Sequence, residues 1–263
     1  PDPKPEAESI RDHVAFWKRS LYTATTAKRL SAEVGLVHQE EAFLGGLLQD
    51  LGQLALAQVL GQTYTRLLRQ AAQENRCLVE LERAELETDH PEIGAALAEA
   101  WNLPPLLVAP IRYHEAPDQA DAETASLVQC VALGNEVAGI FIHDEPAGAM
   151  EAYQRKALDW FGLAPERSEP LLREIHTHSN EMRRLFDLPT GELGNPDEIL
   201  ARANEALMQI SLQTQQQSSE LEQQNRELTE KVNIDSLTGV ANRGRLSEFI
   251  SEQFDISQRQ NTD

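Results

Sequence analysis

The chain has 263 residues, of which 41% are hydrophobic, which is enough for one large or two modest folded domains. Its 43 acidic residues outnumber the 23 Lys and Arg residues, and the resulting net charge of −20 disfavours nucleic acid and anionic membranes as partners. No apolar run approaches the roughly 20 residues that cross a bilayer. Cys77 and Cys130 lack metal-type spacing. We therefore expect a cytoplasmic protein with reduced thiols.

Helical periodicity dominates the first part of the chain. One set of apolar residues predicts a helix that closes at Gly35: Ala24, Ala27, Leu30 and Val34. A second set predicts one continuous helix with Asp50 beside its apolar face: Leu44, Leu47, Leu48, Leu51 and Leu54. Strand patterns are missing before residue 232. The sequence therefore predicts an all-α bundle.

A change of composition marks the end of this bundle. Prolines and glycines interrupt residues 185–196, and a Gln- and Glu-rich helix without Pro or Gly is predicted over 197–232. Four leucines fall on one seven-residue repeat of this helix, with mostly polar residues at the partner positions: Leu200, Leu207, Leu221 and Leu228. That is half of a coiled-coil seam, so we expect a parallel homodimer through the 200–232 helix. A flexible Gln-rich linker is the alternative.

Several motifs of the predicted bundle resemble one known family. The stretch Gly46-Leu47-Leu48-Gln49-Asp50-Leu51-Gly52 resembles the helix on which metal-dependent phosphohydrolases of the HD superfamily carry a His-Asp pair. Three further stretches match the HDOD family, the HD-related output domains, in order and spacing: residues 16–24, 89–104 and 111–115. The resemblance implies an HD-like helical domain over 13–188, with 1–12 as a poorly defined N-terminal segment and the N-terminal part of the family pattern missing.

The same resemblance locates the four metal-ligand positions of the HD superfamily. They fall on Arg19, Gln49, Asp50 and Asn135, so only Asp50 keeps a ligand. One carboxylate, two carboxamides and a guanidinium supply too little negative charge for a divalent metal. A His-Asp pair does occur at His143, but it lies in a loop-like stretch and is not expected to bind a metal. We therefore expect no catalytic residue, no metal and no cofactor, and hence no enzyme activity in this chain.

His90 and His114 leave a metal-dependent alternative open. The diesterase branch of the superfamily uses extra histidines at such positions to hold a second metal. If the chain holds a metal, its expected ligands are Asp50, His90 and His114, and the alternative function is a phosphohydrolase or phosphodiesterase. The structural interpretation is that Asp89 caps a helix, so that the His90 ring contacts local backbone, while His114 belongs to a small hydrogen-bonded group.

The last segment resembles a second family. Five residues reproduce the Asp-x-Leu-Thr-x-x-x-Asn-Arg motif that opens GGDEF domains, the diguanylate cyclase modules: Asp235, Leu237, Thr238, Asn242 and Arg243. This resemblance implies that residues 233–263 are the truncated start of a GGDEF domain, because the Gly-Gly-Asp-Glu-Phe sequence itself is absent.

Together the two resemblances imply a cytoplasmic module of cyclic di-GMP signalling. In it a non-catalytic HD-like sensor of an unidentified small ligand controls its own C-terminal cyclase domain through the dimerising helix, and the full-length parent is a diguanylate cyclase. A pure protein-interaction scaffold is a further alternative.

Overall fold

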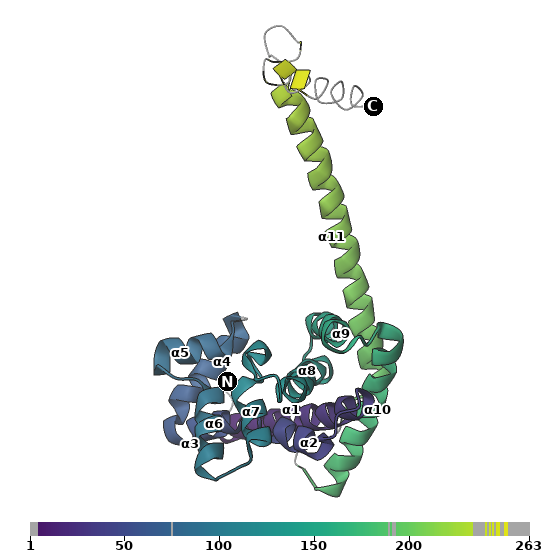
Figure 1. Ribbon diagram of the computed structural model, residues 1–263. Coiled ribbons are helices and arrows are strands. Elements are labelled where there is room, and N and C mark those ends of the chain that lie inside the picture. Colours follow the sequence, from purple (N-terminus) through teal and green to yellow (C-terminus); the bar gives the residue numbers. More distant parts are fainter. Residues whose placement is uncertain are drawn as a thin grey trace. The chain divides into compact units, whose positions relative to one another are not determined.

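The computed structural model describes residues 5–74, 76–188, 190 and 193–233, with a few further positions between 240 and 251. These residues form helices and no strand, in agreement with the predicted all-α class. The helices are α1 (Pro5–Glu33), α2 (Gln39–Leu48), α3 (Leu51–Leu60), α4 (Gln62–Glu74), α5 (Leu78–Leu86), α6 (His90–Ala100), α7 (Pro105–Tyr113), the short 3-10 helix η1 (Pro117–Gln119), α8 (Ala125–Ile142), α9 (Ala147–Phe161), α10 (Pro165–Leu185) and α11 (Pro196–Asn233) (Figure 1).

The chain divides into two compact units, Pro1–Leu207 and Met208–Asp263. The first unit is the helical bundle, and it begins earlier than expected. Residues 5–12, which we expected to be a poorly defined segment, form the first turns of α1. The helix ends where the apolar pattern predicted, because Gly35 adopts a left-handed φ of 75° two residues after its last turn.

The bundle is organised around α1, which packs mainly against α8, α2 and α10. The largest apolar core joins α1 to α8, α9, α10 and the first turns of α11, and its fully buried large side chains include Tyr22, Leu133, Met150, Tyr153 and Leu172. Two smaller apolar clusters complete the core. One packs α3, α4 and α5 together, and the other packs α6 against α7. Helices α3 to α6 therefore form a group at one end of the bundle, with α9 and α10 at the other (Figure 1).

The expected continuous helix over Leu44–Leu54 is wrong. The structure breaks it at Gln49 and Asp50 into α2 and α3, and Leu44 and Leu54 are exposed. On either side of the break, a glycine allows the backbone of another helix to approach closely. A Cβ on Gly46 would lie 2.8 Å from the Ala24 Cα in α1, and one on Gly52 would lie 1.9 Å from the His90 carbonyl oxygen in α6.

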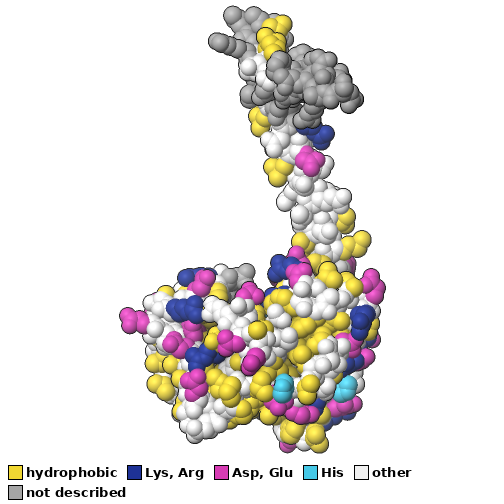
Figure 2. All heavy atoms as spheres, in the orientation of Figure 1, with side chains coloured by type: hydrophobic (Ala, Val, Ile, Leu, Met, Phe, Trp, Pro, Cys, Tyr) yellow, Lys and Arg dark blue, Asp and Glu magenta, His cyan; other side chains and the backbone are white. Residues whose placement is uncertain are grey.

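The start of α11 also differs from the expectation. Leu200 and Ala203 are buried in the apolar core of the bundle, and Leu207 packs against it. Leu200 and Leu207 are therefore not free for a seam between two chains, because their apolar surface is already covered within their own chain. In the second unit, Leu221 and Leu228 are 62% and 59% exposed, and hydrophobic side chains recur along this part of the helix (Figure 2). If α11 pairs with a second chain, the contact must therefore be made by residues after 207.

Two stretches of the bundle are long and apolar enough to cross a membrane by length and composition, contrary to our expectation from the sequence. They are Gln39–Leu60 and Ala125–Ile142, and 33% and 61% of their apolar windows are buried in the structure. Core helices of soluble proteins pass the same test, and α8 carries much of the largest apolar core of the bundle. The cytoplasmic location stays a prediction.

The close approach at Gly52 generates a stability prediction. Gly52→Ala should lower the free energy of unfolding by about 3 kcal/mol, because the added methyl group meets the His90 backbone and α3 and α6 must separate. Gly148→Ala is the matched control, because its Cβ meets nothing within 4 Å, and it should be neutral or stabilising by up to about 1 kcal/mol. Urea denaturation measures both. Equal stability of the two variants would contradict the close packing of α3 on α6.

Candidate functional site

Asp50 is a buried carboxylate at the junction of α2 and α3, and its side chain is 1% exposed. Its Oδ1 accepts a hydrogen bond from Gln53 Nε2 at 2.7 Å, and its Oδ2 accepts one from Gln49 Nε2 at 3.2 Å. Arg19 Nε lies 3.5 Å from the same Oδ2. Burial raises the pKa of Asp50, but the Arg19 charge and the nearby His114 lower it more, so that the pKa lies well below its usual range. The carboxylate is therefore ionised.

All four positions that correspond to HD-superfamily ligands come together in space. The Asn135 side-chain oxygen, on α8, accepts from Gln49 Nε2 at 2.5 Å and from Arg19 Nε at 3.3 Å. Arg19, Gln49, Asp50 and Asn135 thus form a hydrogen-bonded ring that joins α1, the α2–α3 junction and α8. The donors of this ring are nitrogens that carry hydrogen, and one of them is a fixed cation, so the set does not fit a divalent metal.

His90 stands at the start of α6, where Asp89 caps the helix as predicted by accepting from the Glu92 amide at 2.8 Å. The expectation that the His90 ring contacts local backbone is wrong. Its Nδ1 lies 2.7 Å from Glu82 Oε2, and the same oxygen accepts from the His90 amide at 3.0 Å. The Tyr64 hydroxyl donates to the other Glu82 oxygen. Glu82 is completely buried, and this fixes the His90 ring.

Sequence reasoning missed Glu82 and Tyr64. Both lie on helices, α5 and α4, whose other polar residues mostly face solvent, and nothing in the local pattern separates a buried acid from an exposed one. The one signal was Tyr64 itself, an aromatic residue between two threonines. Its type predicts that the side chain is buried, but it does not identify the residue that it contacts.

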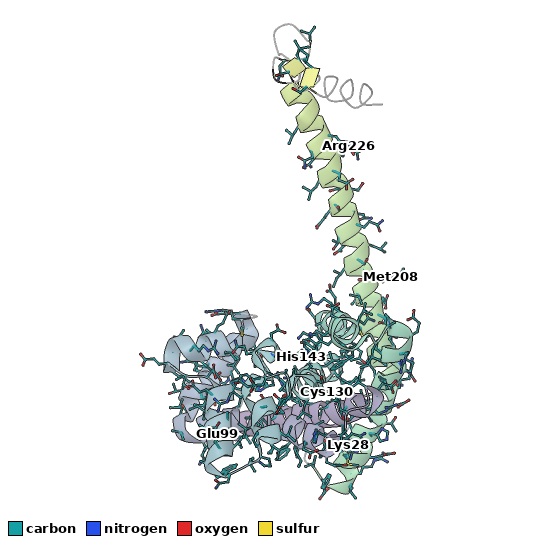
Figure 3. All side chains as sticks on the ribbon, in the orientation of Figure 1. Lys28, Glu99, Cys130, His143, Met208 and Arg226 are labelled. Atoms are coloured by element: carbon teal, nitrogen blue, oxygen red, sulfur yellow. The ribbon has the colours of Figure 1, made fainter. Side chains whose placement is uncertain are left out.

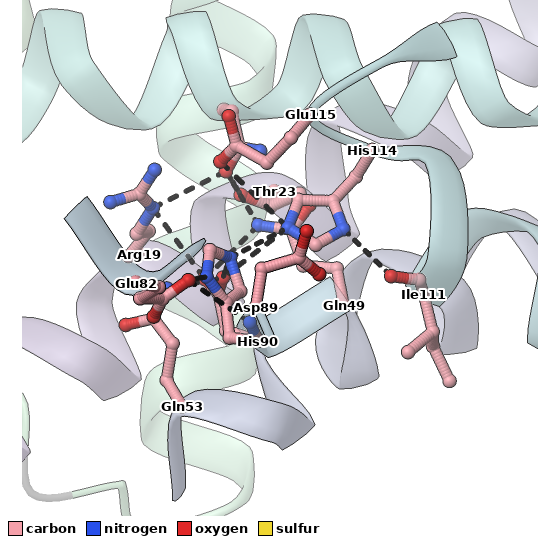
Figure 4. Close-up of polar contacts among 12 residues, drawn as sticks. Arg19, Thr23, Gln49, Gln53, Glu82, Asp89, His90, Ile111, His114 and Glu115 are labelled. Carbon is pink, nitrogen blue, oxygen red and sulfur yellow. Dashed lines mark hydrogen bonds and ion pairs between the residues drawn. The ribbon is translucent and has the colours of Figure 1, made fainter. Parts of the chain in front are cut away.

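The two histidine rings face each other (Figure 4). His114 Nδ1 lies 3.0 Å from the Ile111 carbonyl oxygen, which can only accept, so this nitrogen carries the hydrogen. Glu82 imposes the same arrangement on His90. The two Nε2 atoms therefore direct lone pairs at one another across 3.3 Å. Burial lowers the pKa of His114, but the hydrogen bond and charge of Asp50 raise it more, so protonation of the His114 ring is favoured.

A metal ion would satisfy the same three atoms. Asp50 Oδ1 lies 3.7 Å from His90 Nε2 and 3.6 Å from His114 Nε2, and these donor atoms lie within 4.8 Å of one another. Ligands about 2.0 to 2.1 Å from a tetrahedral zinc ion are roughly 3.3 to 3.4 Å apart. The histidine pair matches that spacing, and Asp50 needs only a small shift. Hydrogen bonds from the outer nitrogens orient both rings, as in metal sites.

A cleft of about 1340 Å³ lies beside this cluster, between α1, α3, α4 and α8. Arg19, Gln53 and Asn135 line it, whereas Asp50 and the two histidines of the cluster are not part of its lining. His143, at the end of α8 (Figure 3), also lines the cleft rather than joining the cluster. Burial, and then the Arg19 charge, lower the pKa of His143, which keeps it neutral near pH 7.

Most residues of the GGDEF-like motif lie outside the part of the chain that the structure describes. Asp235, Leu237, Thr238 and Arg243 lie outside the described residues. Asn242 is described, and its carbonyl oxygen accepts from the Leu246 amide at 3.1 Å.

Removing the central carboxylate should destabilise the bundle. Asp50→Ala removes the acceptor of the Gln53 amide and the carboxylate beside the Arg19 guanidinium, and we expect a loss of about 3 kcal/mol. Glu40→Ala is the control, because it breaks an exposed ion pair with Lys28 and should cost less than about 1 kcal/mol. Chemical denaturation at pH 7 compares the two. An Asp50→Ala cost no larger than that of the control would refute the structural role of the carboxylate.

Comparison with known proteins identifies the fold. The model of the HDOD domain family matches residues 4–117. An uncharacterized protein of Treponema pallidum is 27% identical over 149 residues, which are 57% of this chain and 28% of that protein.

Two crystal structures share the fold. An HDOD domain protein of unknown function from Geobacter sulfurreducens has a TM-score of 0.51 at 21% identity, over 67% of this chain and 62% of that one. A protein from Marinobacter aquaeolei whose name suggests signal transduction has a TM-score of 0.54 at 19% identity, over 66% of this chain and 39% of that one. The chain thus spans less than two thirds of the length of each of these relatives.

Proposed function

This chain contains an HDOD domain, an HD-like helical domain that the family comparison places at residues 4–117, and we propose that it acts as a non-catalytic sensor module in signal transduction. One observation carries the proposal. The four positions that would hold a catalytic metal are occupied by side chains that bond to one another, with Arg19 and Gln49 donating to Asn135 and the Gln49 amide also donating to Asp50.

The chemistry of this ring explains why hydrolysis is not expected. A metal-dependent phosphohydrolase needs a metal to activate water and to neutralise charge on the phosphate. Here the Arg19 guanidinium lies beside the one remaining carboxylate, Asp50, and a cation in that place repels a metal ion. The helical frame is kept while the groups that would perform the chemistry are replaced.

Metal content and turnover test this function. The purified chain should hold less than one equivalent of iron, manganese or zinc by elemental analysis and should not hydrolyse phosphodiesters. Restoring the ligands with Arg19→His, Gln49→His and Asn135→Asp together should raise metal affinity, because the backbone frame is retained. Near-stoichiometric metal that is lost in Asp50→Ala, together with turnover, would overturn the proposal.

A second candidate function is a metal-dependent phosphohydrolase that uses Asp50, His90 and His114. The spacing of their three donor atoms favours it. Against it stands burial, because all three residues are at most 3% exposed and none lines the cleft. A metal lost in His114→Ala with no hydrolysis in the parent chain would indicate a closed structural ion and leave the sensor proposal standing.

The output of the sensor is the finer part of the proposal. We assign it to a diguanylate cyclase that begins at residue 233, because α11 leads to Asn233 and the GGDEF-like motif follows directly. Cyclases of that family join two GTP molecules held by two facing protomers, so a paired helix that changes spacing or rotation would control them in the cytoplasm. A chain that joins this segment to a complete GGDEF domain should convert GTP to cyclic di-GMP, and a lack of turnover would remove this output.

Pairing through the second half of α11 is testable in the chain itself. Leu221→Ser with Leu228→Ser should convert a weak homodimer into a monomer, because each leucine contributes about 1.5 to 3 kcal/mol when fully buried, offset by the polar partner positions. Leu158→Ser is the control, since this leucine is 50% exposed on α9 of the bundle. Sedimentation velocity over a concentration series measures the outcome. A monomeric parent chain, or an oligomer unchanged in the double variant, would reduce α11 to a tether.

A further inference from the structure

The cleft between α1, α3, α4 and α8 has an unusual composition for this protein. Asp and Glu make up 43 of 263 residues, about one in six, yet none of the 20 described residues that line the cleft is acidic. Three arginines are among them: Arg19, Arg66 and Arg69. In a chain of net charge −20, a concave surface whose described charged side chains are all positive favours small anions over cations.

The arginines come from two helices, Arg19 from α1 and the other two from α4. Arg19 uses its Nε atom for Asp50 and Asn135, and its two terminal nitrogens point away from that cluster (Figure 4). Arg66 and Arg69 lie three residues apart on α4 and therefore share a face of that helix. Arg66 is exposed and has no acidic partner among the described residues. Guanidinium groups of this kind suit the planar, two-oxygen geometry of phosphate.

The remaining lining suits the body of an organic ligand. Phe16 lies one turn before Arg19 on α1, and Leu54 and Leu68 add apolar surface. Gln58 and Gln62 supply amides that can donate and accept. A cleft of about 1340 Å³ is somewhat larger than most small-molecule sites, so it can hold a phosphate group together with a ring system.

We propose that this cleft binds a small organic phosphate, with Arg19 and Arg66 on the phosphate and Phe16 against the ring of the ligand. The inference rests on the proposed sensor function and names the chemical class of its signal. Arg19 has a double role here. Its Nε side belongs to the ring with Asp50 and Asn135, and its terminal nitrogens face the ligand, so occupancy of the cleft changes the balance of charge on the buried Asp50.

Isothermal titration calorimetry on the purified chain tests the proposal. The ligands are adenosine and guanosine 5′-diphosphate, the uncharged nucleosides adenosine and guanosine, and inorganic pyrophosphate. We expect a diphosphate nucleotide to bind, pyrophosphate to bind more weakly because it lacks a ring, and the nucleosides not to bind. Arg66→Glu should weaken nucleotide binding roughly tenfold to hundredfold, because it replaces a charge-assisted contact by repulsion.

Arg155→Glu is the matched control. Arg155 is an exposed arginine on α9 with no ion pair among the described residues, so this variant makes the same change in net charge outside the cleft and should bind as the parent does. Equal weakening in both variants, nucleoside binding as tight as nucleotide binding, or no binding of any of these compounds would overturn the organic-phosphate site. Product analysis of the same samples separates the two proposals, because hydrolysis of a bound nucleotide would overturn the non-catalytic function while supporting the site.

Discussion

The bundle depends on how one buried carboxylate is neutralised. Asp50 lies at the junction of α2 and α3 with 1% of its side chain exposed, and a lone ion in such a place would be very costly. Arg19 from α1 and two glutamines of its own segment share the charge. His90 and His114 face it from α6 and the end of α7. Each of these elements is thereby held in one position relative to Asp50.

This arrangement is the physical basis of the proposed non-catalytic function. In a metal centre, the positive charge that balances the carboxylate is the ion. Here a guanidinium supplies that charge, and the two carboxamides, Gln49 and Asn135, bond to each other in place of ligands to an ion. A fixed cation cannot activate water, but it can hold the helices together and present its outer edge to a small anion. In the proposed function, this replacement removes catalysis and leaves a site for a small anion.

The facing histidines are a separate consequence of burial. Glu82 and the Ile111 carbonyl take the Nδ1 hydrogens of His90 and His114, which leaves two lone pairs 3.3 Å apart. Either a proton or a metal ion resolves that contact, and both are favoured by the nearby carboxylate. The three donor residues are at most 3% exposed, and none of them lines the cleft. Structure maintenance is therefore the role that the geometry supports for whichever cation is held there.

The sequence by itself determined what depends on short-range pattern. Apolar periodicity predicted the helical class and the end of α1 at Gly35, and a helix-capping pattern predicted the role of Asp89. These features are local, because 3.6-residue periodicity and caps involve only neighbours along the chain. The resemblance to HDOD domains also placed Arg19, Gln49, Asp50 and Asn135 in one set, although they are separated by up to 116 residues.

Only the tertiary structure decided what depends on distant partners. The same apolar spacing that predicted one helix through Leu44–Leu54 is compatible with a break at Gln49, and α6 packs against Gly52 just after that break. Leu200 fits the seven-residue repeat of the predicted coiled coil, yet it is buried in the bundle of its own chain. In the sequence, Glu82 cannot be distinguished from an exposed acidic residue. In the structure it is buried because it contacts Tyr64 and His90. Periodicity shows which face of a helix is apolar. Which element covers that face depends on residues far away along the chain.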